Sequence, residues 1–195
     1  LIVFLPGSRE AELRRHAPVM NGVVSQLFAK AKYLAIVPNQ RCYDFLRSQE
    51  QDARFLFDEM LLDHGSYCRL QVGGLAAALS QATLAIASTG TVTLECAYFG
   101  VPTIAIYKTS WSTYQIGKRI VQVKFLAMPN LLANEMVFPE FIQDDATAEN
   151  ISREAIALLS NPKRRDEIKS KLAKIVASLG TRGANDRAAK AILGL

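Results

Sequence analysis

The sequence predicts an α/β fold, a Rossmann-like parallel sheet with helices on both faces. Short apolar runs recur along the chain, and longer amphipathic stretches separate them. Strands buried in a parallel sheet are nearly continuous apolar runs, and the helices between them cover the two faces. With 195 residues, 50% of them hydrophobic, the chain has the size of one domain with a sizeable core. We therefore expect a single domain over residues 1–195, in which residues 144–195 form a helical C-terminal extension.

The N-terminal half of the chain begins with a strand and a long helix. Leu1–Leu5 is an apolar run that ends at the turn Pro6-Gly7-Ser8. Glu10–Lys30 has a helical pattern, with a break expected near Pro18 because proline lacks a backbone N–H. The pattern then predicts a strand at Tyr33–Val37, a short helix at Arg41–Arg47 and a short strand at Phe55–Phe57. A helix of small residues at Gly74–Gln81 and a strand at Leu84–Ala87 follow.

The C-terminal half continues the alternation and then becomes helical. Thr91–Phe99 is predicted to be a helix that ends at Gly100, with Pro102 just beyond. Asn161 followed by Pro162 is a typical helix start. A strand is predicted at Thr103–Tyr107, a helix at Ser112–Val121 and a loop at Met128–Pro139. Three helices are predicted in the remainder, at Thr147–Leu159, Pro162–Leu179 and Ala184–Leu193.

The net charge of +5 is concentrated near the C-terminal end. Residues 161–195 hold nine Lys or Arg against three Asp or Glu, whereas residues 1–160 hold fourteen against fifteen. A solvated helix surface explains such a segment, and contact with an anionic membrane surface is the alternative. No nucleic-acid-binding motif accompanies the basic residues, so no nucleic-acid partner is expected.

Cysteine and histidine are too sparse for a metal site or a disulfide framework. Cys42, Cys68 and Cys96 form no C-x-x-C pair, which fits a reducing cytosol. His16 and His64 are the only histidines, and no D-x-D sequence occurs, so no metal is expected. No apolar stretch approaches the roughly 18 residues that cross a bilayer, so no transmembrane helix is predicted.

The turn after the first strand is a candidate anion site. In open parallel sheets, ligands bind beyond the carboxyl ends of the strands. Gly7 allows close backbone approach, Ser8 offers a hydroxyl and a backbone amide, and Arg9 offers a two-pronged guanidinium for a phosphate. An ordinary strand–helix turn is the alternative interpretation.

A second candidate site follows the strand at Leu84–Ala87. Ser88, Thr89 and Thr91 supply hydroxyls around Gly90 and precede a helix whose free N–H groups favour an anion. Glu95 lies about one turn into that helix and is suited to accept hydrogen bonds from ribose hydroxyls. Complementing the helix dipole is the alternative role for Glu95.

The segment from Met128 to Gln143 is a third candidate. Asn130 is a polar residue within an apolar loop, so it must find hydrogen-bonding partners. Glu140 and Gln143 are spaced to share one helix face toward a ligand, and simple helix capping is the alternative.

The order of the motifs carries a family resemblance. Neither G-x-G-x-x-G nor G-x-x-x-x-G-K-[ST] occurs, which disfavours a nicotinamide enzyme and a P-loop ATPase. Two anion sites at strand ends suit a nucleotide diphosphate. L-P-G-S-R, S-T-G-T-V-T-L-E, Y-K, P-N-L-L-A and P-E-x-x-Q occur in this order, at Leu5–Arg9, Ser88–Glu95, Tyr107-Lys108, Pro129–Ala133 and Pro139–Gln143. Together they resemble the C-terminal half of the lipid-A-disaccharide synthase family, bacterial glycosyltransferases of GT-B architecture.

The resemblance implies a reaction and a donor site. The family transfers 2,3-diacylglucosamine from UDP-2,3-diacylglucosamine to 2,3-diacylglucosamine 1-phosphate (lipid X), which gives lipid A disaccharide 1-phosphate and UDP, and no cofactor or metal is expected. This chain would bind the UDP-sugar. By resemblance, Arg9 contacts the diphosphate and stabilises charge on departing UDP, and Ser8, in the same motif, is also counted among the donor-site residues. The remaining donor-site residues would be Thr89, Gly90 and Thr91 at the phosphate, Glu95 at the ribose, Asn130 at the border of the pocket, and Glu140 and Gln143 at the sugar.

The resemblance also implies that an N-terminal acceptor and catalytic domain, with the general base, is missing. The chain opens directly on the apolar run at Leu1, as expected of a fragment that binds the donor without turnover. Oligomerisation stays open.

Basic and aromatic residues interleave between residues 108 and 125, which favours contact with a membrane surface. The resemblance implies that this contact is peripheral, on the cytoplasmic side of the inner membrane of a Gram-negative bacterium. A helix packed on the core is the alternative for this segment, whose residues are Lys108, Trp111, Tyr114, Ile116, Lys118, Arg119, Ile120, Lys124 and Phe125.

The alternative functions for the chain are a domain of another UDP-sugar glycosyltransferase, such as one that uses N-acetylglucosamine, and a membrane-binding module with a vestigial nucleotide pocket.

Overall fold

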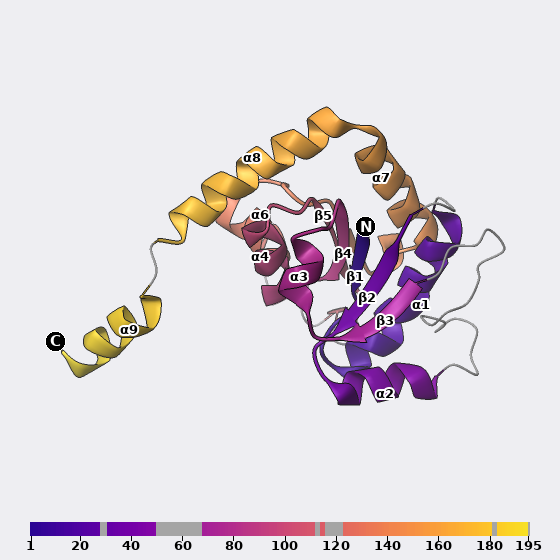
Figure 1. The fold of residues 1–195 in the computed structure, drawn as a ribbon, viewed down its shortest axis with the longest axis horizontal. Coiled ribbons are helices and arrows are strands. Elements are labelled where there is room, and N and C mark those ends of the chain that lie inside the picture. Colours follow the sequence, from indigo (N-terminus) through magenta and orange to yellow (C-terminus); the bar gives the residue numbers. More distant parts are fainter. Residues whose placement is uncertain (28–30, 50–67, 112–113, 116–122, 181–182, 195) are drawn as a thin grey trace.

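A computed structural model describes residues 1–27, 31–49, 68–111, 114–115, 123–180 and 183–194. In this part of the chain, six strands form one sheet in the order β3-β2-β1-β4-β5-β6 (Figure 1). Each neighbouring pair is parallel, so the predicted fold class is confirmed. The strands are β1 (Ile2–Leu5), β2 (Tyr33–Val37), β3 (Cys68–Val72), β4 (Leu84–Ser88), β5 (Thr103–Tyr107) and β6 (Glu140–Ile142).

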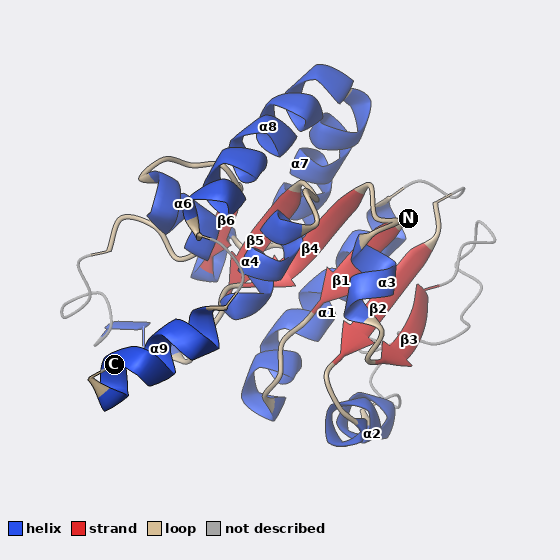
Figure 2. Ribbon diagram, turned by 60° about the vertical axis from the view of Figure 1, so that its left-hand side comes forward, coloured by secondary structure: helices blue, strands red, loops and turns tan. Residues whose placement is uncertain are grey.

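Helices cover both faces of the sheet (Figure 2). α3 and α4 lie on one face and α1 on the other. α7 packs against α1, whereas α8 packs against α4 and α6, and α9 lies apart from the sheet (Figure 1). The described helices are α1 (Glu10–Gln26), α2 (Gln40–Ser48), α3 (Leu75–Leu79), α4 (Thr91–Tyr98), α6 (Met128–Ala133), α7 (Ala148–Ser160), α8 (Pro162–Ser178), α9 (Ala184–Leu193) and the 3-10 turn η2 (Gln143–Asp145).

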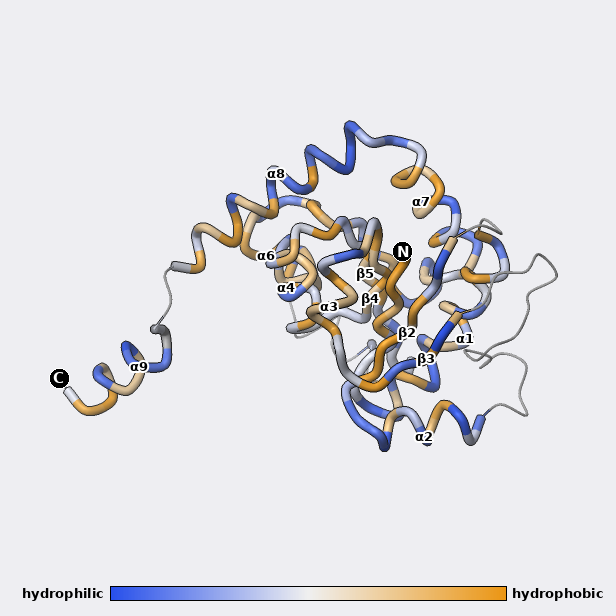
Figure 3. Tube along the Cα trace, in the orientation of Figure 1, coloured by the Kyte–Doolittle hydropathy of each residue, from blue (hydrophilic) through white to orange (hydrophobic). Residues whose placement is uncertain are grey.

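The core lies around the central strands. Every residue of β1 and β4 is buried, as expected of strands covered on both faces, and both strands lie among the hydrophobic segments in Figure 3. The edge strand β3 instead alternates buried Cys68 and Leu70 with exposed Arg69. No helix in the described ranges is both long and apolar enough to cross a bilayer.

Several element predictions need correction. α1 runs through Pro18 without a break, because the helix buries Ala17 and Met20 completely and this burial offsets the lost hydrogen bond. α6 lies within the predicted loop Met128–Pro139, and Pro129 occupies its first turn, where a missing N–H costs nothing. Strands β3 and β6 were not predicted.

Two other predictions are not addressed by the structure. The predicted strand Phe55–Phe57 lies outside the described residues, as does most of the predicted helix Ser112–Val121.

The sheet register brings two loops together. β1 pairs with β4 so that Leu5 lies opposite Ala87. The loops that follow these strands therefore leave the sheet side by side, and they lead into α1 and α4 on opposite faces. This is the topological switch point of the sheet, where ligands of open α/β folds bind.

Candidate functional site

A cavity of about 630 Å³ opens at the carboxyl ends of β1, β2, β3 and β4. It lies at the switch point between β1 and β4, and six of the predicted site residues line it, namely Ser8, Arg9, Thr89, Gly90, Thr91 and Glu95. The other lining residues are Leu5, Gly7, Glu12, Ile36, Val37, Pro38, Gly73, Gly74, Leu75, Ser88 and Val92.

The loop after β1 wraps closely around one carboxylate. Gly7 has φ +126°, and a Cβ at this position would lie 2.6 Å from Glu12 Oε2. The Ser8 N–H donates to Glu12 Oε2 over 3.0 Å, and Arg9 Nη1 donates to Glu12 Oε1 over 3.3 Å. The Arg9 side chain is 80% exposed, so its remaining donors are accessible at the cavity.

The loop after β4 is held in place by the buried hydroxyl of Thr93. Gly90 has φ +134°, a conformation that favours glycine, and no neighbour approaches the position of a Cβ. Thr93 Oγ1 donates to the Gly90 carbonyl over 2.7 Å and accepts from the Met128 N–H over 3.2 Å. Thr91 and Val92, in the first turn of α4, line the cavity, and Thr93 ties the loop to α6.

One wall of the cavity was not predicted from the sequence. Ile36, Val37 and Pro38 at the end of β2, with Gly73 and Gly74 after β3, form a largely apolar side opposite the polar loops. Gly73 and Gly74 both have positive φ, at +67° and +75°. The Gly-Gly pair was the available signal, but β3 itself was not recognised from its mixed polarity.

His16 fixes the loop after β1 to the end of β5. Its ring is buried, with Nδ1 2.9 Å from the Pro6 carbonyl oxygen, and Nε2 accepts from the Lys108 N–H over 3.0 Å. This arrangement requires a neutral ring that donates through Nδ1. Burial, the largest influence, lowers the pKa of His16 from 6.5, so the neutral form is favoured.

Asn130 and Glu140 do not line the cavity. Asn130 is fully buried, and its Oδ1 accepts from the Val137 and Phe138 N–H groups over 2.9 and 2.7 Å. Its Nδ2 donates to the Phe138 carbonyl and to Glu140 Oε1. Glu140 also accepts from the backbone N–H groups of Leu126 and Ala127. We call Asn130, Glu140 and the backbone groups that they bond the Asn130–Glu140 cluster.

Gln143 also lies away from the cavity and joins neighbouring loops. Its Oε1 accepts from the Thr109 N–H over 2.7 Å, and Lys108 Nζ donates to the Gln143 carbonyl over 2.7 Å. The prediction that Glu140 and Gln143 share a helix face is wrong, because Glu140 begins β6 and Gln143 begins η2. Their predicted contact with the donor sugar, like that of Asn130 with the pocket, stays a prediction.

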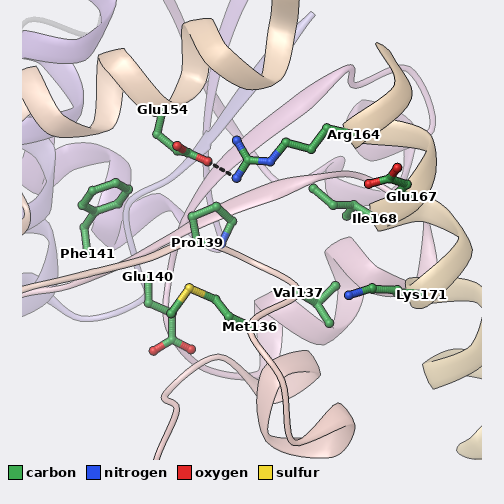
Figure 4. Close-up of a pocket in the computed structure, with 10 residues that line it drawn as sticks. All are labelled: Met136, Val137, Pro139, Glu140, Phe141, Glu154, Arg164, Glu167, Ile168 and Lys171. Atoms are coloured by element: carbon green, nitrogen blue, oxygen red, sulfur yellow. Dashed lines mark hydrogen bonds and ion pairs between the residues drawn. The ribbon is translucent and has the colours of Figure 1, made fainter. Parts of the chain in front are cut away.

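A second cavity, of about 360 Å³, lies between β6 and the helices α7 and α8 (Figure 4). Two of its lining residues, Arg164 and Glu154, form an ion pair with 2.5 Å between Nη2 and Oε1. Glu140 is at its border, with the carboxylate turned away from that pair. Among the described residues, no group of three or more His, Cys, Asp or Glu side chains is arranged to hold a metal ion.

The comparison with known families identifies the chain. A family model described as lipid-A-disaccharide synthetase matches residues 1–193. The chain belongs to this family. It is 34% identical to the lipid-A-disaccharide synthase of Solibacter usitatus over 98% of this chain and 48% of that protein. It is 32% identical to the synthase of Syntrophus aciditrophicus over 100% of this chain and 49% of that protein. The chain thus spans about half the length of these relatives.

Solved structures share the fold at low sequence identity. Acinetobacter baumannii MurG superposes with a TM-score of 0.54 at 16% identity, covering 100% of this chain and 49% of MurG. The spinosyn rhamnosyltransferase SpnG superposes with a TM-score of 0.53 at 13% identity, over 89% of this chain and 42% of SpnG. The chain has the Rossmann-like fold that the resemblance to GT-B glycosyltransferases predicted.

Proposed function

We propose that this chain binds the UDP-sugar donor of a lipid A glycosyltransferase in the cavity at the switch point. One observation carries the proposal: in a member of the lipid-A-disaccharide synthase family, two glycine-containing loops and the starts of α1 and α4 meet at one cavity. Backbone N–H groups at helix starts are suited to phosphate groups, and glycine allows a ligand to approach the backbone closely.

The proposed reaction is that of the family. The whole enzyme transfers 2,3-diacylglucosamine from UDP-2,3-diacylglucosamine to lipid X and releases UDP. Attack by the acceptor hydroxyl on the anomeric carbon requires a general base. We assign the acceptor site and that base to the portion of the enzyme outside this chain, which spans about half the length of its relatives. The chain alone is then a donor-binding unit without turnover.

The diphosphate and the uracil base of the ligand are assigned to opposite sides of the cavity. Ser8 and Arg9 on one loop, and Thr89, Gly90 and Thr91 on the other, bind the diphosphate. The uracil base lies against the opposite wall, because Ile36–Pro38 and Gly73-Gly74 offer apolar surface and accessible backbone there.

Glu95 is the proposed ribose ligand. It lies on α4 and lines the cavity. In the part of the chain that the structure describes, its carboxylate makes no hydrogen bond to another side chain or to the backbone, which leaves it available to ribose hydroxyls.

The same groups stabilise charge on the leaving UDP. Arg9 is a fixed cation, and the first turn of α4 presents partial positive charge to the developing diphosphate. We propose that these groups bind the diphosphate without a metal or other cofactor. EDTA should therefore leave the affinity for UDP unchanged, and an affinity that depends on added Mg²⁺ would contradict this proposal.

Calorimetric titration with UDP tests the proposed site. Arg9→Ala removes a charge-assisted contact and should weaken UDP binding about 10- to 100-fold. Arg153→Ala is the matched control, because Arg153 is an exposed arginine on α7 that pairs with Glu149. Binding that is absent in the folded wild-type chain, or equally strong in Arg9→Ala, would contradict the proposal.

The identity of the donor sugar is tested by competition. UDP-2,3-diacylglucosamine should displace bound UDP at lower concentration than UDP-N-acetylglucosamine does. The opposite order would favour the alternative, a domain of another UDP-sugar glycosyltransferase.

We further propose peripheral membrane contact through the surface around α6. Five apolar side chains between residues 123 and 136 are 37–60% exposed, and Lys124 is exposed beside them. Large exposed apolar patches near basic residues are typical of membrane-surface contact. The apolar residues are Val123, Met128, Leu131, Leu132 and Met136. Four residues of the basic and aromatic segment, Ile116, Lys118, Arg119 and Ile120, lie outside the described residues.

Co-sedimentation with vesicles that contain anionic phospholipid tests this surface. Replacing Leu131 and Leu132 together by Ser should reduce the bound fraction, whereas Ile156→Ser on α7 should not. Vesicle binding by a chain that does not bind UDP would favour the alternative of a membrane-binding module.

A further inference from the structure

The charge of the cavity opposes the ligand proposed for it. Among the described residues that line the cavity, Arg9 is the single cation, whereas Glu12 and Glu95 bring two carboxylates. A nucleotide diphosphate would add further negative charge. Glu95 has a role at the ribose, so Glu12 is the residue whose presence requires an explanation.

Glu12 occupies the anion donors of the loop after β1. Its Oε2 accepts from the Ser8 N–H over 3.0 Å, and its Oε1 accepts from Arg9 Nη1 over 3.3 Å. The carboxylate also lies against Gly7, since a Cβ built there would be 2.6 Å from Oε2. A phosphate group that binds this loop needs the same amide and the same guanidinium.

Helix capping explains only part of this geometry. Arg9 is the N-cap of α1, so Glu12 is the third helical residue, from which a glutamate often reaches back to the N–H of the N-cap. Glu12 instead bonds the N–H of Ser8, one residue before the N-cap, which is a variant of this capping. Capping does not require the ion pair between Glu12 and Arg9. This pair occupies one donor of Arg9, which is the single cation among the described lining residues.

We propose that Glu12 sets the affinity of the site by competing with the phosphate for the Ser8 amide and the Arg9 guanidinium. This inference rests on the proposed function. The carboxylate keeps the Ser8 amide and Arg9 in place, and the incoming diphosphate displaces it from both. Its negative charge then lies next to the bound diphosphate, weakens binding and favours release of UDP.

Glu12→Gln separates the charge from the hydrogen bond. Glutamine can still accept from the Ser8 N–H but carries no charge. We expect this variant to bind UDP about 10-fold more tightly than the wild-type chain, because a like charge beside the diphosphate is removed. Affinity for uridine, which lacks phosphate, should not change. Calorimetric titrations with UDP and with uridine measure both effects.

Glu10→Gln is the matched control. Glu10 lies in the same first turn of α1, but its carboxylate pairs with Arg41 at 2.8 Å and does not line the cavity. Its substitution should leave the affinity for UDP close to that of the wild-type chain. Equal tightening in both variants would assign the effect to the general charge of the helix start and would overturn the proposal.

The remaining outcomes also decide the question. If the wild-type chain binds UDP and Glu12→Gln binds it equally or more weakly, Glu12 positions Arg9 or caps the helix, and the inference is overturned while the proposed function stands. If neither binds UDP, both fail. Glu12→Ala is a second variant in case Glu12→Gln folds poorly, and it should also bind UDP more tightly than the wild-type chain.

Discussion

Two regions of this molecule carry polar residues next to apolar runs, and they use them in opposite ways. The strand-end loops, residues 6–9 and 88–91, present their polar groups to a cavity, and the Arg9 side chain is 80% exposed. In the Asn130–Glu140 cluster, Asn130 is completely buried and its side-chain oxygen and nitrogen each bond two protein groups. All the polar groups of the Asn130 side chain are bonded within the protein core, whereas the exposed Arg9 keeps donors that a ligand can reach.

The two regions are nevertheless connected. Thr93 accepts from the Met128 N–H at the start of α6 and donates to the carbonyl of Gly90 in the strand-end loop. The Asn130–Glu140 cluster bonds α6 to β6, so it supports the loop after β4 through α6 and Thr93. Substitutions in the cluster should therefore affect stability first, and substitutions in the loops should affect binding first.

The largest expected effect is on stability, at Asn130. Asn130→Leu leaves the N–H groups of Val137 and Phe138 buried without their partner. We expect a loss of about 3–4 kcal/mol in the free energy of unfolding, measured by urea denaturation. Asn185→Ala on exposed α9 should change it by less than about 0.5 kcal/mol. A loss of UDP affinity in Asn130→Leu with little loss of stability would place the cluster in the ligand site.

A smaller effect, on both stability and binding, is expected at Gly7. Gly7→Ala combines φ +126° with a Cβ that would lie 2.8 Å from Glu12 Cβ, which cannot swing away, so it should cost about 2 kcal/mol of stability and weaken UDP binding by displacing the loop. Gly100→Ala also has a positive φ, at +65°, but no atom lies within 4 Å of its Cβ. It should cost about 1 kcal/mol and leave UDP binding unchanged. Equal binding by Gly7→Ala and wild type would remove this loop from the site.

The smallest effect concerns His16 and pH. Burial lowers the pKa of His16 below 6.5, so below pH 6.5 the unfolded chain takes up a proton that the folded chain resists. The stability that neutral His16 contributes is therefore present above this pH and lost as the pH falls. Between pH 7.5 and 5.5 the wild-type chain should lose up to about 1.4 kcal/mol more than His16→Gln. Parallel pH profiles for the two proteins would contradict this assignment.

The central sheet was predictable because its strands are continuous apolar runs. The segments that form β1, β2, β4 and β5 consist of apolar residues, except for a few polar residues at their ends. β3 contains Arg69 and Gln71 because it is an edge strand, and β6 has only three residues. Neither had a clear apolar pattern.

The site was predictable only as far as chain position determines it. Ser8–Arg9 and Thr89–Thr91 follow strands directly, so the parallel topology brings them to one edge. Asn130 looked equally suited to a ligand, but its partners Phe138 and Glu140 lie eight and ten residues further along the chain. Only the folded geometry reveals that pairing.

Hydrogen exchange of the wild-type chain with and without UDP shows whether the strand-end loops hold the nucleotide. We predict slower exchange on UDP binding for the amides of Ser8, Arg9, Gly90 and Thr91, which line the cavity. Amides in the Asn130–Glu140 cluster should exchange at the same rate in both states. Protection confined to residues 128–143, with none in residues 6–9 and 88–91, would show that the nucleotide does not bind at the strand-end loops.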